Sequence, residues 1–406
     1  MKKKSKVYLD QAATSFPKPE SVYQAVDEFS RTVGIGSGRG FYRESREVSR
    51  IYRETRTGLA DLIGSRPEEI ILTSGTTDSL NTILLGCLRD GDHVIISPFE
   101  HNSMTRPLNY LVRNRGVTFT RLDGSLAGGI EPGKIEKIIR PETRLCLINH
   151  ISNAFGIVAP VREIGKILRK HDDIIFVVDG AQSLGTYSIN VEEMEIDFLA
   201  FSGHKGLLGP TGTGGFYVRE KIFERVNPLK YGGTGIRSLD PVMIDDLPHK
   251  YEVGTMNSWG IAGLLAGITH IRERGLSSIN QHIEEMTRRA AEGISRIDSI
   301  TTYLPSPEIH HSVISFNLGE LRPRETASLL DKVFNIKVRD GLHCAPDAHR
   351  TVGTAPLGTV RASFGIFNTE DDVDYLYEAL SELARSFKDA GYETEGKNEH
   401  PISNGQ

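Results

Sequence analysis

Two stretches decide the fold of this chain: DIIFVVDGAQS (residues 173–183) and DFLAFSGHKGLLG (residues 197–209). Each is a short run of apolar, β-favouring residues that ends in glycine and polar side chains, which is typical of a buried strand. Similar runs occur at 69–75, 92–98 and 143–150, and helical patterns occur at 77–91 and 161–172. Strands that alternate with helices predict a mostly parallel, doubly wound α/β sheet with helices on both faces.

The C-terminal part of the chain follows a different pattern. We expect one long helical region at 259–298, a strand within 311–319, and helices near 323–332 and 370–389. These elements predict a smaller α+β domain. We therefore assign residues 16–255 to a large domain and residues 1–15 and 256–390 to the small one. The polar residues 391–406 are expected to form a disordered tail.

Composition excludes several classes of function. A formal net charge of −5 and a pI near 6.3 give no general attraction to nucleic acid or to an anionic membrane. Three cysteines in 406 residues cannot build a disulfide framework. The N-terminus lacks the apolar run of a signal peptide, and the most apolar later stretch, 259–268, is too short to span a bilayer. A cytoplasmic protein is expected.

The ends of the two deciding strands carry an acid and a lysine. Ligands bind beyond the carboxyl ends of strands in open parallel sheets. Asp179 could be a cap or a metal ligand there, or it could pair with the pyridinium nitrogen of pyridoxal phosphate (PLP). Lys205, enclosed at the end of the next strand, could lose its proton and become a nucleophilic amine, although a lone loop lysine is usually exposed. Its position one strand after Asp179 favours the PLP interpretation.

A phosphate cradle is expected between the strand at 69–75 and the helix that follows it. Gly75, Thr76 and Thr77 stand where backbone N–H groups and the helix dipole favour an anion. A threonine cap is also common without any ligand. The chain has neither a Walker loop nor a properly placed G-x-G-x-x-G motif, which disfavours nucleotide and nicotinamide cofactors.

Three further side chains follow strands and could contact a flat ring. His101 could stack on it, and Asn153 and Gln182 could bond its oxygen. Each also has an ordinary interpretation, since a loop histidine is usually a surface residue and a loop amide usually satisfies a turn.

The motifs LDQAATSFPKP, SGTTDSLN, VVDGAQS, FSGHKGLLGPTG and YEVGTMNS appear in the order found in class V aminotransferases, which the chain resembles over nearly its whole length before the tail. The resemblance implies the PLP-dependent transferase fold type I and a homodimer with its sites at the subunit interface. It implies that Lys205 is the Schiff-base lysine and that Asp179 pairs with the ring nitrogen.

The same resemblance implies roles for the surrounding residues. Asn153 and Gln182 would flank the ring hydroxyl, and His101 would stack on the ring. The phosphate would be held by Thr76, Thr77, Ser202 and His204, and by a Gly-Thr pair from the partner subunit, which here is Gly254 and Thr255.

The three cysteines differ in their surroundings. Cys87 and Cys146 stand in apolar stretches and look like core residues, whereas Cys344 stands in the polar segment 337–351 beside His343. Cys344 could be a reactive thiolate or a chance loop cysteine. A metal site made of His343, Cys344 and His349 has no supporting motif, and no metal is expected.

The segment around Cys344 resembles the R-x-G-x-H-C-A element of group II cysteine desulfurases, in which the cysteine accepts sulfur. By this resemblance Arg361 holds the substrate α-carboxylate, Arg39 also lines the site, and L-cysteine is converted to L-alanine. A sulfur-acceptor protein is then an expected partner.

Residues 346–363 depart from the best-known desulfurases and resemble a less characterised, desulfurase-like branch. Alternatives therefore stay open. They are a selenocysteine lyase acting on L-selenocysteine, another class V aminotransferase, lyase or epimerase in which Cys344 is incidental, and a non-catalytic PLP-binding or sulfur-relay protein.

Overall fold

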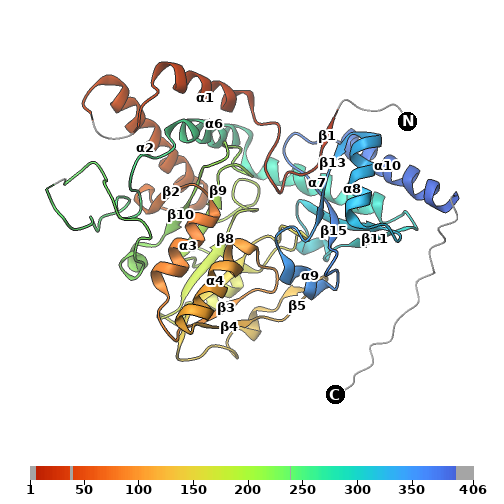
Figure 1. Ribbon diagram of the computed structural model, residues 1–406, viewed down its shortest axis with the longest axis horizontal. Helices are drawn as coiled ribbons and strands as arrows, with labels where there is room; N and C mark the ends of the chain where they lie inside the picture. The colour runs from red at the N-terminus through yellow and green to blue at the C-terminus, as the bar shows by residue number, and fades with distance from the viewer. Residues whose placement is uncertain (1–5, 37–39, 238, 390–406) are drawn as a thin grey trace.

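A computed structural model describes residues 6–36, 40–237 and 239–389 of the chain. It contains a large central sheet and a smaller antiparallel sheet, each with its own helices (Figure 1). The predicted tail, 391–406, lies outside the described residues.

The central sheet has seven strands in the order β2-β10-β9-β8-β7-β3-β4. Only β10 runs antiparallel to its neighbours. The predicted mostly parallel sheet is thus confirmed, and its five predicted strands are β2, β3, β7, β8 and β9. The strands are β2 (Ile70–Thr73), β3 (His93–Ile96), β4 (Thr118–Arg121), β7 (Thr143–Asn149), β8 (Ile175–Asp179), β9 (Phe198–Ser202) and β10 (Gly214–Val218).

Successive residues of a strand point to opposite faces of the sheet, so apolar side chains on both faces need cover. Helices supply it on each face (Figure 1). Phe176 belongs to one core cluster, together with α2, α5 and α6, and Val177 belongs to the other, together with α3 and α4. The helices of this part are α1 (Glu20–Thr32), α2 (Arg43–Ile63), α3 (Thr76–Cys87), α4 (Asn102–Arg115), α5 (Val161–Leu168) and α6 (Ser258–Arg274).

The smaller sheet is antiparallel, in the order β11-β12-β15-β14. A separate core cluster joins it to α7, α8 and α10, and to β1, which pairs with β13. The elements are β1 (Val7–Tyr8), α7 (Leu276–Ile294), β11 (Ile300–Tyr303), β12 (Val313–Leu318), α8 (Pro323–Phe334), β13 (Ile336–Lys337), β14 (Arg339–Gly341), α9 (Pro346–Val352), β15 (Thr359–Ser363) and α10 (Glu370–Asp389).

The predicted single helical region at 259–298 is wrong, because it is two helices. Gly275 separates α6 from α7 with φ of 84°, a conformation that glycine adopts without steric cost. Ile261 and Ile268 of α6 pack in the core of the large sheet, whereas Met286 and Ile294 of α7 pack in that of the small sheet. The domain boundaries stay a prediction.

Short elements complete the chain. The strands β5 (Gly124–Ser125) and β6 (Gly129–Ile130) form a small hairpin, and 3-10 turns occupy Pro67–Glu69, Pro132–Lys134, Glu220–Arg225 and Pro307–Ile309. Within the described ranges, no helix has the length and apolar character that a membrane crossing requires.

Candidate active site

The carboxyl ends of β8 and β9 carry two of the predicted residues. Asp179 and Ser202 are the last residues of these parallel neighbours. Asp179 is only 3% exposed and accepts a 2.9 Å hydrogen bond from the N–H of Ala181. Burial raises the pKa of its carboxyl, while that hydrogen bond and the nearby Lys205 act in the opposite direction. Asp179 is therefore a buried acid that can still accept a hydrogen bond from another donor.

Lys205 lies in the tight turn that follows β9. Burial lowers the pKa of its amine from 10.5 to about 8. Asp179 and Cys344 favour its charged form, and Arg361 and Arg339 disfavour it. Asp179 belongs to the large sheet, and Arg339 and Arg361 belong to the small one, so charges from both sheets act on one amine. Such an amine is neutral often enough near neutral pH to act as a nucleophile.

The start of α3 is the place where the sequence predicts a phosphate cradle. Gly75 caps the helix with φ of 147°, and the buried Thr76 hydroxyl lies 2.7 Å from that of Ser202. His204 Nδ1 is buried and has no hydrogen-bond partner in the part of the chain that the structure describes. Thr77 is exposed on the first turn. Hydroxyls, an unsatisfied imidazole and a helix N-terminus together suit an anion.

The three predicted ring contacts are held by backbone groups. His101 caps α4, and its Nδ1 accepts a 3.0 Å bond from the N–H of Ser103. Burial, and then the charge of Lys205, lower its pKa to about 3, so its ring is neutral. Gln182 donates to the carbonyl of Ala12 at 2.9 Å. Asn153 Oδ1 is buried and lacks a partner among the described residues.

Arg361 brings the small sheet into the site. It stands in β15 and is fully buried. Nη1 donates to the carbonyl of Asn153 at 2.8 Å, and Nη2 to Asp10 Oδ1 at 2.6 Å. Its Nε–H has no partner within the described ranges. A buried N–H of this kind is costly unless a ligand satisfies it.

Cys344 lies in a loop between β14 and α9. Its thiol is half-buried, and Arg339 Nη2 donates to Sγ at 3.4 Å. Two carbonyls of this loop accept hydrogen bonds from the segments that carry the predicted ring contacts. Asn153 Nδ2 donates to His343 O at 2.6 Å, and the N–H of Asn102 donates to Cys344 O at 2.7 Å. The thiol loop is therefore fixed to both of these segments.

An N-terminal segment that sequence reasoning did not single out lies against the Lys205 turn. The carbonyl of His204 accepts from Ser15 N at 3.0 Å, Thr14 Oγ1 at 2.9 Å, Ser15 Oγ at 3.2 Å and Lys18 Nζ at 3.3 Å. Burial lowers the pKa of Lys18 to about 8. Asp10 and Lys18 stand in the motif LDQAATSFPKP, whose resemblance gives neither a role, and the sequence gives none to Arg339.

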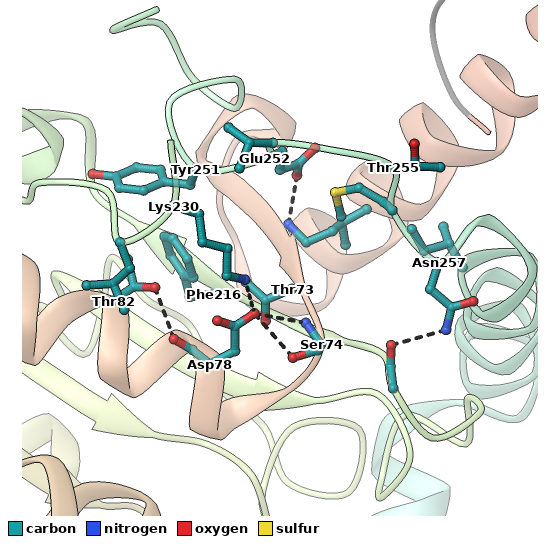
Figure 2. Close-up of a pocket in the computed structure, with 16 residues that line it drawn as sticks. Thr73, Ser74, Asp78, Thr82, Phe216, Lys230, Tyr251, Glu252, Thr255 and Asn257 are labelled. Carbon is teal, nitrogen blue, oxygen red and sulfur yellow. Dashed lines mark hydrogen bonds and ion pairs between the residues drawn. The ribbon is translucent and has the colours of Figure 1, made fainter. Parts of the chain in front are cut away.

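One predicted residue, Thr255, is not part of this group. Thr255 is exposed and lines a separate pocket beside α3, opposite the ion pair of Lys230 with Asp78 (Figure 2). Arg39 lies outside the described residues. Cys146 is buried as expected and Cys87 is half-buried. Across the described residues, no three His, Cys, Asp or Glu side chains are grouped to hold a metal ion.

Comparisons with known proteins match most of the chain. Residues 7–376 match the family described as aminotransferase class-V. The chain is 36% identical to a probable cysteine desulfurase from Pyrococcus abyssi, over 94% of this chain and 95% of that protein. It is 32% identical to a cysteine desulfurase from Haloferax volcanii, over 94% and 90%.

Two solved structures are similar over the same span. An apo cysteine desulfurase from Thermococcus onnurineus NA1 superposes with a TM-score of 0.88 at 37% identity, covering 94% of this chain and 95% of that one. The S-sulfonic acid form of the cysteine desulfurase CsdA from Escherichia coli gives 0.83 at 26% identity, with coverage of 94% and 95%.

Proposed function

The chain belongs to the class V aminotransferase family, and from that premise we propose that it is a PLP-dependent cysteine desulfurase. It converts L-cysteine to L-alanine and receives the sulfur on Cys344. The observation that carries this proposal is the contact of Arg339 with Cys344 Sγ at 3.4 Å beside the buried Arg361, which donates to Asn153 O at 2.8 Å, with the charges of these side chains acting on the buried amine of Lys205. Relatives named cysteine desulfurase over most of the chain support it.

The side chains present fit the cofactor. His204 Nδ1 and Asn153 Oδ1 are buried polar atoms without a partner in the described chain, and Thr76 with Ser202 offers hydroxyls at a helix N-terminus. Asp179 would keep a proton on the ring nitrogen, and Lys205 would bind the cofactor covalently. When bound, PLP supplies an acceptor for the electrons released at the substrate Cα.

Arg361 would hold the substrate carboxylate. Asp10 takes one N–H of Nη2, and the Nε–H, which has no partner among the described residues, marks a side of the guanidinium that a ligand can bind. A buried arginine fixed at two of its nitrogens orients a carboxylate without further loss of side-chain freedom.

Lys205 Nζ would take the proton from Cα, which requires the neutral amine that its lowered pKa provides. The Cys344 thiolate would then attack the substrate sulfur. A sulfur–sulfur bond would form and the carbon–sulfur bond would break, its electron pair staying with Cβ, which would take up a proton. Lys205 Nζ would return its proton to Cα to give alanine. The enzyme is left with a persulfide on Cys344.

A single incubation tests this function. The PLP-loaded protein with L-cysteine should release alanine and gain one sulfur atom on Cys344, as intact mass and peptide mapping would show. The Cys344→Ala variant should lose the persulfide and fall at least about a hundredfold in alanine formation. Unchanged turnover in that variant would contradict a sulfur-accepting role, and a comparison with L-selenocysteine would reveal a preference for selenium.

We also propose a homodimer and a sulfur-acceptor protein as partner. Phe41 is 98% exposed and borders a groove with Ile236 and several arginines, and Leu239 is fully exposed nearby in sequence. Large exposed apolar side chains favour association. In the dimer, Thr255 would reach the phosphate of the partner subunit. Three free cysteines suit a reducing compartment, so we place the protein in the cytoplasm.

A further inference from the structure

The loop that carries Cys344 adopts a conformation that needs anchors. His343 and Cys344 both have positive φ, 49° and 58°. Two consecutive left-handed residues other than glycine are sterically unfavourable and persist only where their surroundings fix them. The carbonyl contacts with Asn153 and Asn102 supply two anchors. The imidazole of His343 supplies a third.

The direction of each hydrogen bond from this imidazole can be worked out. Ser315 Oγ donates to the carbonyl of Ala154 at 2.6 Å, so its oxygen can only accept from Thr359 Oγ1, at 3.1 Å. Thr359 has then used its proton, and it must accept from His343 Nε2 at 3.1 Å. The chain of donors runs in one direction and leaves the proton of His343 on Nε2.

The rest of the ring is enclosed. His343 is 2% exposed, and its ring centroid lies 5.4 Å from that of the fully buried His349. Burial, and then the charge of Arg361, hold its pKa well below the ordinary value. A buried neutral ring whose N–H is committed to Thr359 is suited to hold a loop, and is poorly suited to take a proton from the neighbouring thiol.

We propose that His343 is a positioning residue that fixes the Cys344 thiol loop through its directed hydrogen bond to Thr359. It acts as a donor and not as the base of Cys344. The inference rests on the proposed function, in which Cys344 accepts sulfur, and it adds the residue that holds that cysteine in place.

Three variants separate the two roles. His343→Ala removes the donor, and Thr359→Val removes its acceptor while leaving the imidazole intact. His343→Gln keeps an N–H donor but cannot take up a proton. At equal PLP loading, persulfide formation on Cys344 in a single turnover should slow about tenfold in the first two variants and stay within about threefold in His343→Gln.

Hydrogen exchange provides a readout that needs no activity. The amide of Asn102 donates to Cys344 O, so release of the loop should speed its exchange about tenfold in His343→Ala and Thr359→Val but not in His343→Gln. The pH profile of His343→Gln should match that of the wild type. If His343→Ala does not fold, the inference is tested by persulfide formation and Asn102 exchange in Thr359→Val.

Two outcomes would overturn the inference. The first is that His343→Ala and Thr359→Val behave like the wild type in both measurements. The second is that His343→Gln forms the persulfide as slowly as His343→Ala, which would make the imidazole a base. If the wild type forms no persulfide on Cys344, the proposed function fails. The exchange of Asn102 then still decides whether His343 holds the loop.

Discussion

At the scale of single residues, Lys205 shows how burial creates reactivity. Its pKa of about 8, against 10.5 for an exposed lysine, means that its charged form is unfavourable in the folded protein. Between these two pH values the unfolded chain binds a proton that the folded chain does not. The stability of the cofactor-free protein should therefore rise with pH across this window.

Replacing this amine should stabilise the cofactor-free protein. Lys205→Met removes the charge penalty, so the free energy of unfolding at neutral pH should increase by on the order of 2 kcal/mol. The gain should shrink as pH rises through about 8 and vanish near 10.5. Denaturant unfolding at several pH values measures this.

Lys170→Met is the matched control for that comparison. Lys170 is exposed and pairs with Glu136 at 2.8 Å, so its removal should change stability by less than about 1 kcal/mol. A Lys205→Met variant less stable than the wild type at neutral pH would contradict the sign of the effect.

Sequence reasoning singled out residues at the carboxyl ends of strands. Asp179 and Ser202 end β8 and β9, and Lys205 follows β9, where the parallel order dictates a shared edge. It gave no role to Asp10, Lys18 or Arg339, because their contacts are tertiary. Asp10 meets Arg361 across 351 positions of the chain, and no local pattern encodes such a pairing.

At the scale of elements, the start of α3 depends on close backbone packing. A Cβ on Gly214 of β10 would lie 2.5 Å from Gly75 Cα and 2.6 Å from the carbonyl oxygen of Phe201. Both neighbours are backbone, so neither can move aside without displacing the helix cap or the adjacent strand.

Gly214→Ala should therefore cost at least about 2 kcal/mol in stability and weaken PLP binding. Thermal unfolding and absorbance titration with PLP would measure the two effects. Gly133→Ala is the control, since a Cβ there meets nothing within 4 Å, and its effect should stay within about 0.5 kcal/mol. Equal behaviour of the two variants would count against a packing-dependent cradle.

Elements were predictable where periodicity was strong. The five buried strands and α3, α5, α8 and α10 lie where the patterns place them. The break at Gly275 was missed because apolar residues continue on both sides of it, and only the φ of 84° separates the helices. The antiparallel direction of β10 depends on the short turn after Lys205, which a strand pattern alone does not specify.

At the scale of the whole molecule, the proposed dimer should complete the cofactor site. The double variant Phe41→Asp/Leu239→Asp places charges on the exposed apolar side chains, so it should sediment as a monomer and bind PLP more weakly, since Thr255 could not reach a partner.

Val333→Asp is the control for this experiment. Val333 is 48% exposed on α8 of the small sheet, and its replacement should leave the oligomeric state unchanged. A double variant that remains a dimer with normal PLP affinity would exclude this surface as the interface.

The N-terminal segment has a consequence for biosynthesis. Ala12 donates its N–H to Ser363 Oγ, and Asp10 pairs with Arg361, so the N-terminal segment is anchored by residues that lie 351 positions later in the chain. A nascent chain on the ribosome cannot close this contact until β15 has emerged. A fully formed pocket should therefore acquire the vitamin-derived group only after β15 has left the ribosome.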